Sequence, residues 1–254
     1  MKRAVGMLAL LLAAAGLILW APWAMTPHVQ TVFEAASLLE QDARHGGNGV
    51  TFRADEVDPD EVYRALEARY PYAFSLHAVE RPGRTTVMRV EVSRAARQEQ
   101  ARTYAAVLAD SCISREMSDR QKLRALHDAL VRLCAYDEQT AEEDAPDGAA
   151  APFAADGALI DHRAVCAGYG RAFSMLCEAA GLKAVYVSSE EMNHGWNAVR
   201  LEGQTYYIDC TFDDPVPDRG DYVSSQYFLM TESQLARTHV WDVAFYERLL
   251  DSLL

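Results

Sequence analysis

The sequence lacks the features that mark several other structural classes. No segment repeats at a fixed period and no heptad run of apolar residues occurs, which argues against repeat arrays and long coiled coils. Basic residues are also few, since 24 lysines and arginines stand against 37 aspartates and glutamates, a formal charge of -13. Nucleic-acid binding needs a basic footprint, so we expect no nucleic-acid partner. The acidity is typical of a solvated surface.

Metal-ligand patterns are absent as well. The seven histidines are scattered, no Cys-x-x-Cys pair occurs, and the acidic cluster 142–144 does not have the ligand spacing of a calcium loop. We therefore expect neither a metal nor another cofactor. The number of cysteines is odd, so at least one thiol stays free, and the pairing of the others remains open. Those others are Cys112, Cys134, Cys177 and Cys210. Cys177 is expected to be a buried, unreactive thiol, and Cys210 is expected to lie in a strand directly after Asp209.

An apolar segment precedes the rest of the chain. Lys2 and Arg3 are followed by an uncharged run at 4–25, which is long enough to cross a bilayer because about 20 residues suffice. The positive-inside rule places the two basic residues in the cytoplasm and everything after the run outside. We expect an extracytoplasmic protein that residues 1–26 anchor to the membrane. The alternative is a signal peptide whose cleavage would release a secreted protein.

The remaining chain, about half of it apolar, is predicted to form two parts. Residues 27–115 contain a predicted helix at 58–69 and a hairpin of strands 74–80 and 85–92, followed by another helix, which together make a small α+β region. Residues 116–254 form the second part, and all of the recognisable chemistry lies there.

Cys166 is predicted to begin a helix that runs to about Ala180 and stops at Gly181, a common C-terminal cap. A cysteine in the first turn of a helix lies at the positive end of its dipole, which favours the reactive thiolate. Gly168 and Gly170 are poor helix formers, and their presence in this turn indicates close approach by a backbone or a substrate.

His194 and Asp209 are predicted to lie on one face of a hairpin whose turn is Glu202-Gly203. A two-residue turn pairs Leu201 with Gln204, which makes His194 a diagonal neighbour of Asp209. A carboxylate in this position accepts the imidazole N–H and fixes its tautomer. Each residue alone would be assigned a structural role. Together, the thiol, imidazole and carboxylate match the three parts of covalent acyl transfer.

Three sequence blocks, 164–173, 194–197 and 207–215, resemble the transglutaminase-like superfamily, and most nearly its bacterial, exported members. The resemblance is specific over residues 118–242. Gly195 stands where the family often has alanine, and Phe212 where it often has tryptophan. Neither difference removes a reacting group.

The resemblance implies an α+β fold with a papain-like core, in which the cysteine helix packs on an antiparallel sheet. It makes Cys166 the nucleophile, His194 the base and Asp209 the orienting acid of an enzyme that acts on protein or peptide amides. Tyr136 is a candidate second oxyanion donor, and Trp196 is a candidate wall of the substrate site or a packing residue. Asn197 and His239 are expected to be structural. The alternatives are an exported cysteine protease and a non-catalytic binding or assembly module.

Overall fold

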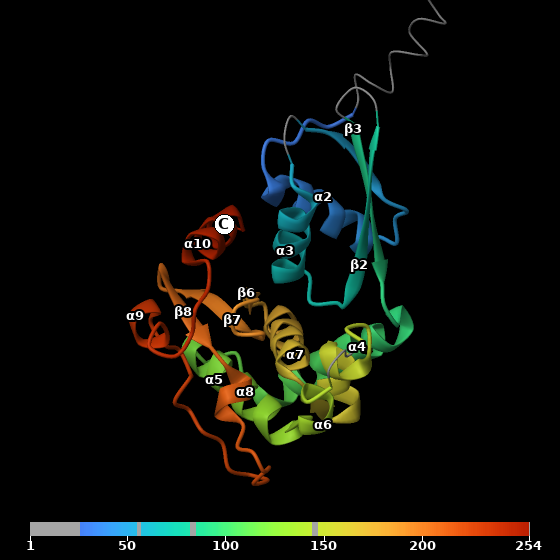
Figure 1. Ribbon diagram of the computed structural model, residues 1–254. Coiled ribbons are helices and arrows are strands. Elements are labelled where there is room, and N and C mark those ends of the chain that lie inside the picture. Colours follow the sequence, from blue (N-terminus) through green and yellow to red (C-terminus); the bar gives the residue numbers. More distant parts are fainter. Residues whose placement is uncertain (1–25, 55–56, 82–84, 144–146, 254) are drawn as a thin grey trace, which may run out of the picture. The chain divides into compact units, whose positions relative to one another are not determined.

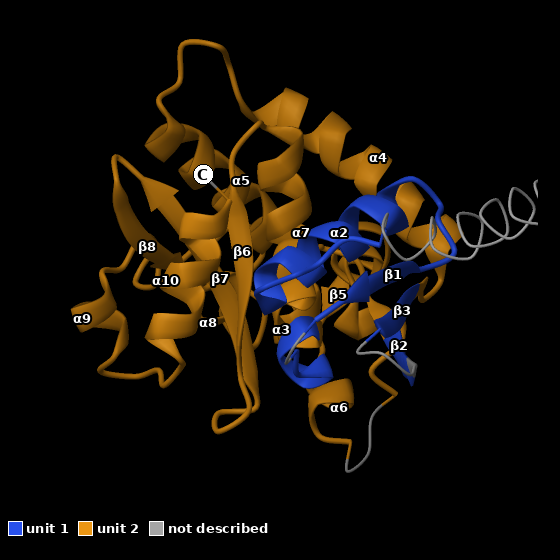
Figure 2. Ribbon diagram, turned by 90° about the horizontal axis from the view of Figure 1, so that it is seen from above, with its two compact units in different colours: residues 1–62, 76–90 blue, residues 63–75, 91–254 orange. Residues whose placement is uncertain are grey.

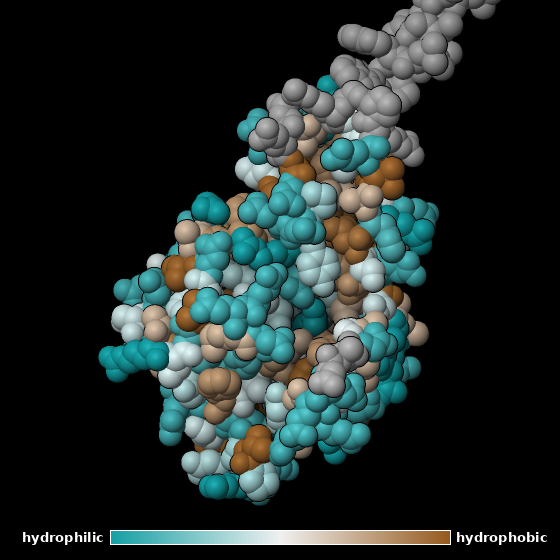
Figure 3. Space-filling model, viewed as in Figure 1, coloured by the Kyte–Doolittle hydropathy of each residue, from teal (hydrophilic) through white to brown (hydrophobic). Residues whose placement is uncertain are grey.

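The computed structural model describes residues 26–54, 57–81, 85–143 and 147–253 (Figure 1). The chain divides into two compact units, drawn in different colours in Figure 2. Unit 1 comprises residues 1–62 and 76–90, and unit 2 comprises residues 63–75 and 91–254. On the face drawn in Figure 3, hydrophilic residues predominate and hydrophobic ones form small patches between them, as the acidic composition predicts. The predicted boundary between residues 115 and 116 stays a prediction.

Unit 1 is a small sheet with a helix. Its sheet has the order β1-β3-β2, with β1 antiparallel to β3. Leu39, Phe52 and Met88 are fully buried in its core. The predicted helix and hairpin are confirmed, with boundaries shifted by a residue or less. The elements are α2 (Val32–Arg44), β1 (Val50–Arg53), α3 (Pro59–Arg69), which continues into unit 2, β2 (Phe74–Arg81) and β3 (Thr85–Val92).

Unit 2 is organised around α7 (Cys166–Ala179), which contacts α4 (Ala95–Cys112) and α5 (Asp119–Leu133) as well as strands β6 and β7. Helix α5 begins at a reciprocal capping box between Ser118 and Gln121, which satisfies two of the free N–H groups at the helix start. Helix α7 is buried along most of its length, so it forms the centre of this unit.

The sheet of unit 2 consists of β6 (Ala184–Ser189), β7 (His194–Leu201) and β8 (Gln204–Ile208), all antiparallel. Leu201 pairs with Gln204, and both turn residues, Glu202 and Gly203, have positive φ, as a two-residue hairpin turn requires. Because α7 packs on this antiparallel sheet, the predicted α+β class and the position of the cysteine helix are confirmed.

Short elements join these layers. Strand β4 (Ala135–Tyr136) runs parallel to β5 (Arg163–Ala164), which ends just before α7. The expected loop at 138–156 contains α6 (Glu138–Ala141) and the 3-10 turn η1 (Ala151–Phe153), and a π-helical turn, η2 (Gly157–Asp161), follows. The C-terminal part adds α8 (Cys210–Asp213), α9 (Glu232–Leu235) and α10 (Val243–Ser252).

Two further expectations concern Cys210 and the N-terminal segment. Cys210 was expected in a strand, but it begins α8, because the Asp209 side chain caps the N-terminus of that helix. The predicted apolar helix at 1–26 lies almost entirely outside the described residues. Within the described ranges, no helix combines the length and apolar character needed to cross a bilayer.

Candidate active site

Cys166 is the first residue of α7 and is partly exposed. Its helix starts without a side-chain cap, so the first backbone N–H groups are free to face a ligand. The close approach predicted at Gly168 is confirmed, since a Cβ there would lie 2.4 Å from the Pro152 carbonyl oxygen. The start of α7 therefore presents the thiol beside unused hydrogen-bond donors.

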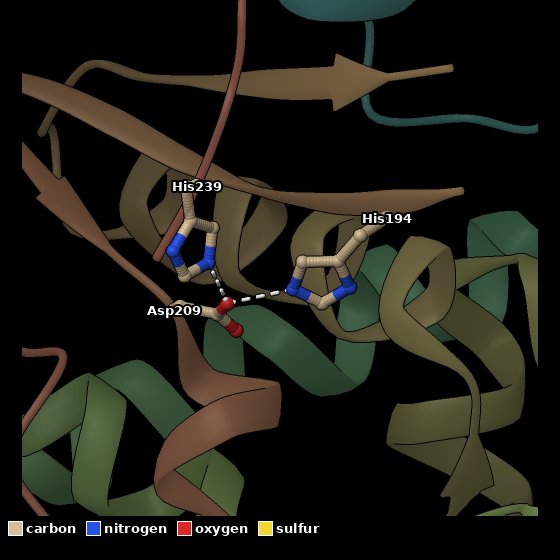
Figure 4. Close-up of side chains that lie close together, drawn as sticks. All are labelled: His194, Asp209 and His239. Carbon is tan, nitrogen blue, oxygen red and sulfur yellow. Dashed lines mark hydrogen bonds and ion pairs between the residues drawn. The ribbon is translucent and has the colours of Figure 1, made fainter. Parts of the chain in front are cut away.

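His194 and Asp209 lie together, as the hairpin register predicts. The Nε2 atom of His194 is 2.7 Å from Oδ2 of Asp209 (Figure 4). Asp209 is fully buried, and its Oδ1 atom accepts the backbone N–H groups of Thr211 at 2.9 Å and Phe212 at 3.0 Å. The same carboxylate thus caps α8 and binds the imidazole, which fixes its orientation.

His239 is a second partner of Asp209 that the sequence did not reveal. Its Nε2 atom is 3.0 Å from Oδ2 of Asp209 (Figure 4). Its Nδ1 atom is 2.8 Å from the Thr238 hydroxyl. His239 is 2% exposed, so the expected structural role is compatible with its burial, but its contact is with the proposed triad itself. No local pattern signals a partner that lies 30 residues earlier in the chain.

The hydrogen bonds of this site determine its charge state. Burial alone would lower the pKa of His194, but the interactions with the Asp209 carboxylate and with the Cys166 sulfur outweigh it and raise that pKa to about 10. Burial alone would raise the pKa of Asp209, and its bonds from His194 and His239 hold that pKa below the ordinary value. The imidazole is therefore cationic at neutral pH, and the structure brings Cys166, His194 and Asp209 together.

Two aromatic rings stack near the imidazole. The Trp196 ring lies 5.6 Å from that of His194, but Trp196 is 1% exposed, so packing is the role that its position supports. The Phe212 ring lies closer, at 4.6 Å and 28° to the imidazole, and Phe212 is 44% exposed. Of these two rings beside His194, Phe212 is therefore the one exposed to solvent.

Tyr136 is positioned by the pairing of β4 with β5, in which it lies opposite Ala164. Burial and then the negative charge of Cys166 raise the pKa of Tyr136, so its hydroxyl stays protonated at neutral pH. Tyr136 is partly exposed and remains available as a hydrogen-bond donor.

Tyr186 explains two glycines. Its ring lies between α7 and β7, where a Cβ at Gly170 would be 2.5 Å from the ring and a Cβ at Gly195 would be 2.0 Å from the hydroxyl. This contact gives a physical reason for glycine beside His194. Asn197 is structural as expected, because its amide donates to the Gly170 carbonyl at 3.0 Å and ties β7 to α7.

A buried charge cluster supports the site from α5. The ring nitrogens of His127 lie 2.9 Å from Asp128 and 3.1 Å from Asp213, and His127 is fully buried. Asp213 accepts the Tyr227 N–H at 3.1 Å, and the Tyr227 carbonyl accepts the Asp209 N–H at 3.0 Å. Burial would lower the pKa of His127, but the two carboxylates raise it, so a cation holds the segment that positions Asp209.

The other thiols are not part of the site. All five cysteines are free in the structure, and Cys134, Cys177 and Cys210 are buried. Burial raises the pKa of each of these three thiols, which makes them inert. Cys177 therefore has the buried, unreactive position predicted for it.

The ligand atoms of His194, Asp209 and His239 lie within 4.8 Å of one another, a spacing that a metal site would also show. However, the Asp209 carboxylate already accepts four hydrogen bonds, two at each oxygen. Those bonds account for the cluster without an ion.

Comparisons with known proteins agree with this geometry. Residues 106–210 match the family model of the transglutaminase-like superfamily. The chain is 25% identical over 136 residues to kyphoscoliosis peptidase of Mus musculus, covering 46% of this chain and 20% of that protein. The chain thus spans about a fifth of the length of this curated relative.

Two solved structures are also similar. One is the crystal structure of a TGase, with 16% identity and a TM-score of 0.37, covering 64% of this chain and 51% of that chain. The other is a candidate cysteine protease from Cytophaga hutchinsonii, with 12% identity and a TM-score of 0.34, covering 67% and 70%. The stretch that matches the transglutaminase-like superfamily model, residues 106–210, contains Cys166, His194 and Asp209.

Proposed function

We propose that the protein is a cysteine enzyme that cleaves protein or peptide amides through a thioester on Cys166. The observation that carries the proposal is the fully buried Asp209 carboxylate, 2.7 Å from the imidazole of His194, whose pKa Cys166 also helps to raise. A thiolate beside a held imidazolium is the arrangement that nucleophilic thiol catalysis needs.

The reaction follows from these contacts. The Cys166 sulfur attacks the amide carbonyl carbon, and the carbonyl oxygen takes the negative charge. The backbone N–H of Cys166 and the Tyr136 hydroxyl are the proposed donors to that oxygen. When the C–N bond breaks, the His194 imidazolium gives its proton to the leaving nitrogen, and a thioester remains. An amine or water then attacks, returning its proton to His194 and releasing the thiolate.

One experiment tests the nucleophile. The protein is treated with iodoacetamide at mildly acidic pH and the labelled cysteine is mapped by mass spectrometry. We expect selective labelling of Cys166 that His194→Ala abolishes, because the imidazole holds the thiolate. Buried Cys177 is the internal control. Labelling of Cys166 no faster than a free thiol would overturn the catalytic proposal and favour the non-catalytic binding module.

A second measurement separates transfer from hydrolysis. The protein is incubated with a glutamine peptide and a primary amine, and the masses of the products are measured by mass spectrometry. A peptide mass increased by the attached amine indicates acyl transfer. A mass that corresponds to conversion of the glutamine amide to a carboxylic acid indicates deamidation, and cleavage of the peptide chain indicates peptidase activity. The name of the mouse relative, a peptidase, supports including the last outcome.

We also propose that the domain acts outside the cytoplasm, attached to the membrane by residues 1–26. The support is the uncharged run at 4–25 that follows Lys2 and Arg3. The full chain is expected in the membrane fraction of an expressing cell, and a chain without residues 1–26 is expected in the soluble fraction. Equal distribution of the two chains would overturn this part of the proposal.

A further inference from the structure

Phe212 combines burial on one side with exposure on the other. It belongs to α8, directly after the residues that Asp209 caps, and its own N–H donates to Asp209 at 3.0 Å. Its ring stacks on His194 at 4.6 Å and contacts His239 at 4.9 Å, yet the residue is 44% exposed. The backbone that holds the triad therefore also holds an exposed apolar ring against the imidazole.

The proposed reaction places an amine nitrogen next to His194, beside the Phe212 ring. In the first half of the reaction His194 gives its proton to the departing nitrogen, and in the second half it takes a proton from the attacking one. Either nitrogen must lie within hydrogen-bonding distance of the imidazole. The substituent on that nitrogen then lies beside the exposed part of Phe212.

Resting on the proposed function, we propose that Phe212 is a specificity-determining residue that binds the apolar part of the amine-side group, whether leaving amine or acceptor. Val240, which follows His239 in the chain, is a second exposed apolar residue at 50% exposure. The Val240 N–H lies 3.1 Å from the Met192 sulfur, which fixes this segment near the start of β7. The site thus prefers amines that carry an alkyl chain over small or strongly polar ones.

The expected size of the preference follows from the burial of methylene groups. Complete burial of one methylene changes affinity roughly fourfold, so contact with one side of a ring is expected to give about twofold for each. The chain of n-pentylamine is four methylenes longer than methylamine, which predicts a preference of roughly 16-fold.

The test uses an acyl donor that does not depend on the natural substrate. Acylation by p-nitrophenyl acetate is followed as a burst of p-nitrophenol, and the amide and acetate products are then quantified with each amine. The ratio of amide to acetate is corrected for the intrinsic reactivity of each amine, which is measured with a small thioester in solution. The variants are Phe212→Ser, Phe212→Leu and Val107→Ser, the last removing a residue that is 64% exposed on α4.

The wild type and Val107→Ser are expected to show the preference for n-pentylamine, Phe212→Leu to keep part of it, and Phe212→Ser to lose it. A uniform loss for all amines in Phe212→Ser and Phe212→Leu would overturn the inference and leave Phe212 as a residue that only positions His194. A burst without any preference in the wild type would also overturn it while leaving the proposed function intact. If the wild type gives no burst beyond that of Cys166→Ala, the proposed function fails and the inference fails with it.

Discussion

Replacement of Asp209 by asparagine should disable the thiolate while leaving the fold intact. The amide oxygen of asparagine can still accept the N–H groups of Thr211 and Phe212, so the cap of α8 is retained. The amide nitrogen replaces Oδ2, which now accepts from both His194 and His239. The side-chain NH2 group of the new asparagine is itself a donor, so it cannot accept from the N–H groups of His194 and His239. His194 must then accept a hydrogen bond through the lone pair at its Nε2 atom.

The consequence for Cys166 can be worked out. A neutral His194 that accepts at Nε2 carries its proton on Nδ1, the nitrogen left for the thiol, and no longer balances a thiolate. An ordinary cysteine is only about 0.3% thiolate near pH 6. The thiolate population of a complete ion pair therefore exceeds that of an ordinary cysteine by at most about 300-fold. An ion-paired thiolate is also a weaker nucleophile, so we expect alkylation about ten to thirty times slower in Asp209→Asn.

The assay is the rate of iodoacetamide alkylation of Cys166 from about pH 5 to about pH 9. Because the pKa of His194 is raised to about 10, the imidazole stays cationic over this range, and the wild-type rate should exceed that of Asp209→Asn at acidic pH. The Asp209→Asn rate should fall about tenfold for each pH unit below the ordinary thiol pKa. Asp119→Asn, an exposed change at the start of α5, is the matched control. Equal rates in wild type and Asp209→Asn near pH 6 would refute the role of the carboxylate.

Three further predictions concern the surroundings of the triad. His127→Ala should lower the free energy of unfolding by about 3 kcal/mol below about pH 6.5, because it leaves Asp213 buried without its cation. Since the pKa of His127 is raised, the difference should shrink as the pH rises from the ordinary histidine value through that raised pKa, and a constant difference in urea titrations would contradict this. Burial raises the pKa of Asp214 to about 6, so the native state holds a proton that the unfolded state releases, and stability is lost as the pH rises from about 4 through about 6. Asp214→Asn should therefore be about 1 kcal/mol more stable than the wild type near pH 7 and equally stable near pH 4. The same gain in stability at both pH values would exclude the titration of Asp214 as its cause. Tyr136→Phe should lower kcat about 100-fold and leave Cys166 alkylation unchanged, whereas a parallel loss of both would show that Tyr136 positions the thiol and does not stabilise the oxyanion.

Local physics determined the parts of the site that the sequence predicts correctly. The helix start at Cys166 follows from its neighbours, and the Glu202-Gly203 turn alone sets the register that brings Asp209 to His194. Both depend on residues close together in the chain, where periodicity and turn chemistry carry the information.

Contacts across the chain decided the rest. His239 reaches Asp209 from 30 residues away, and His127 supports the same segment from α5 through Asp213, which lies 86 residues later. No periodic pattern encodes such partners, because they meet only when the helices and the sheet pack. Burial likewise separated Trp196, which packs inside, from Phe212, which stays exposed on the imidazole. The sequence therefore determined the local structure around Cys166, His194 and Asp209, and the tertiary structure decided which distant side chains hold this cluster and which ring beside it stays exposed.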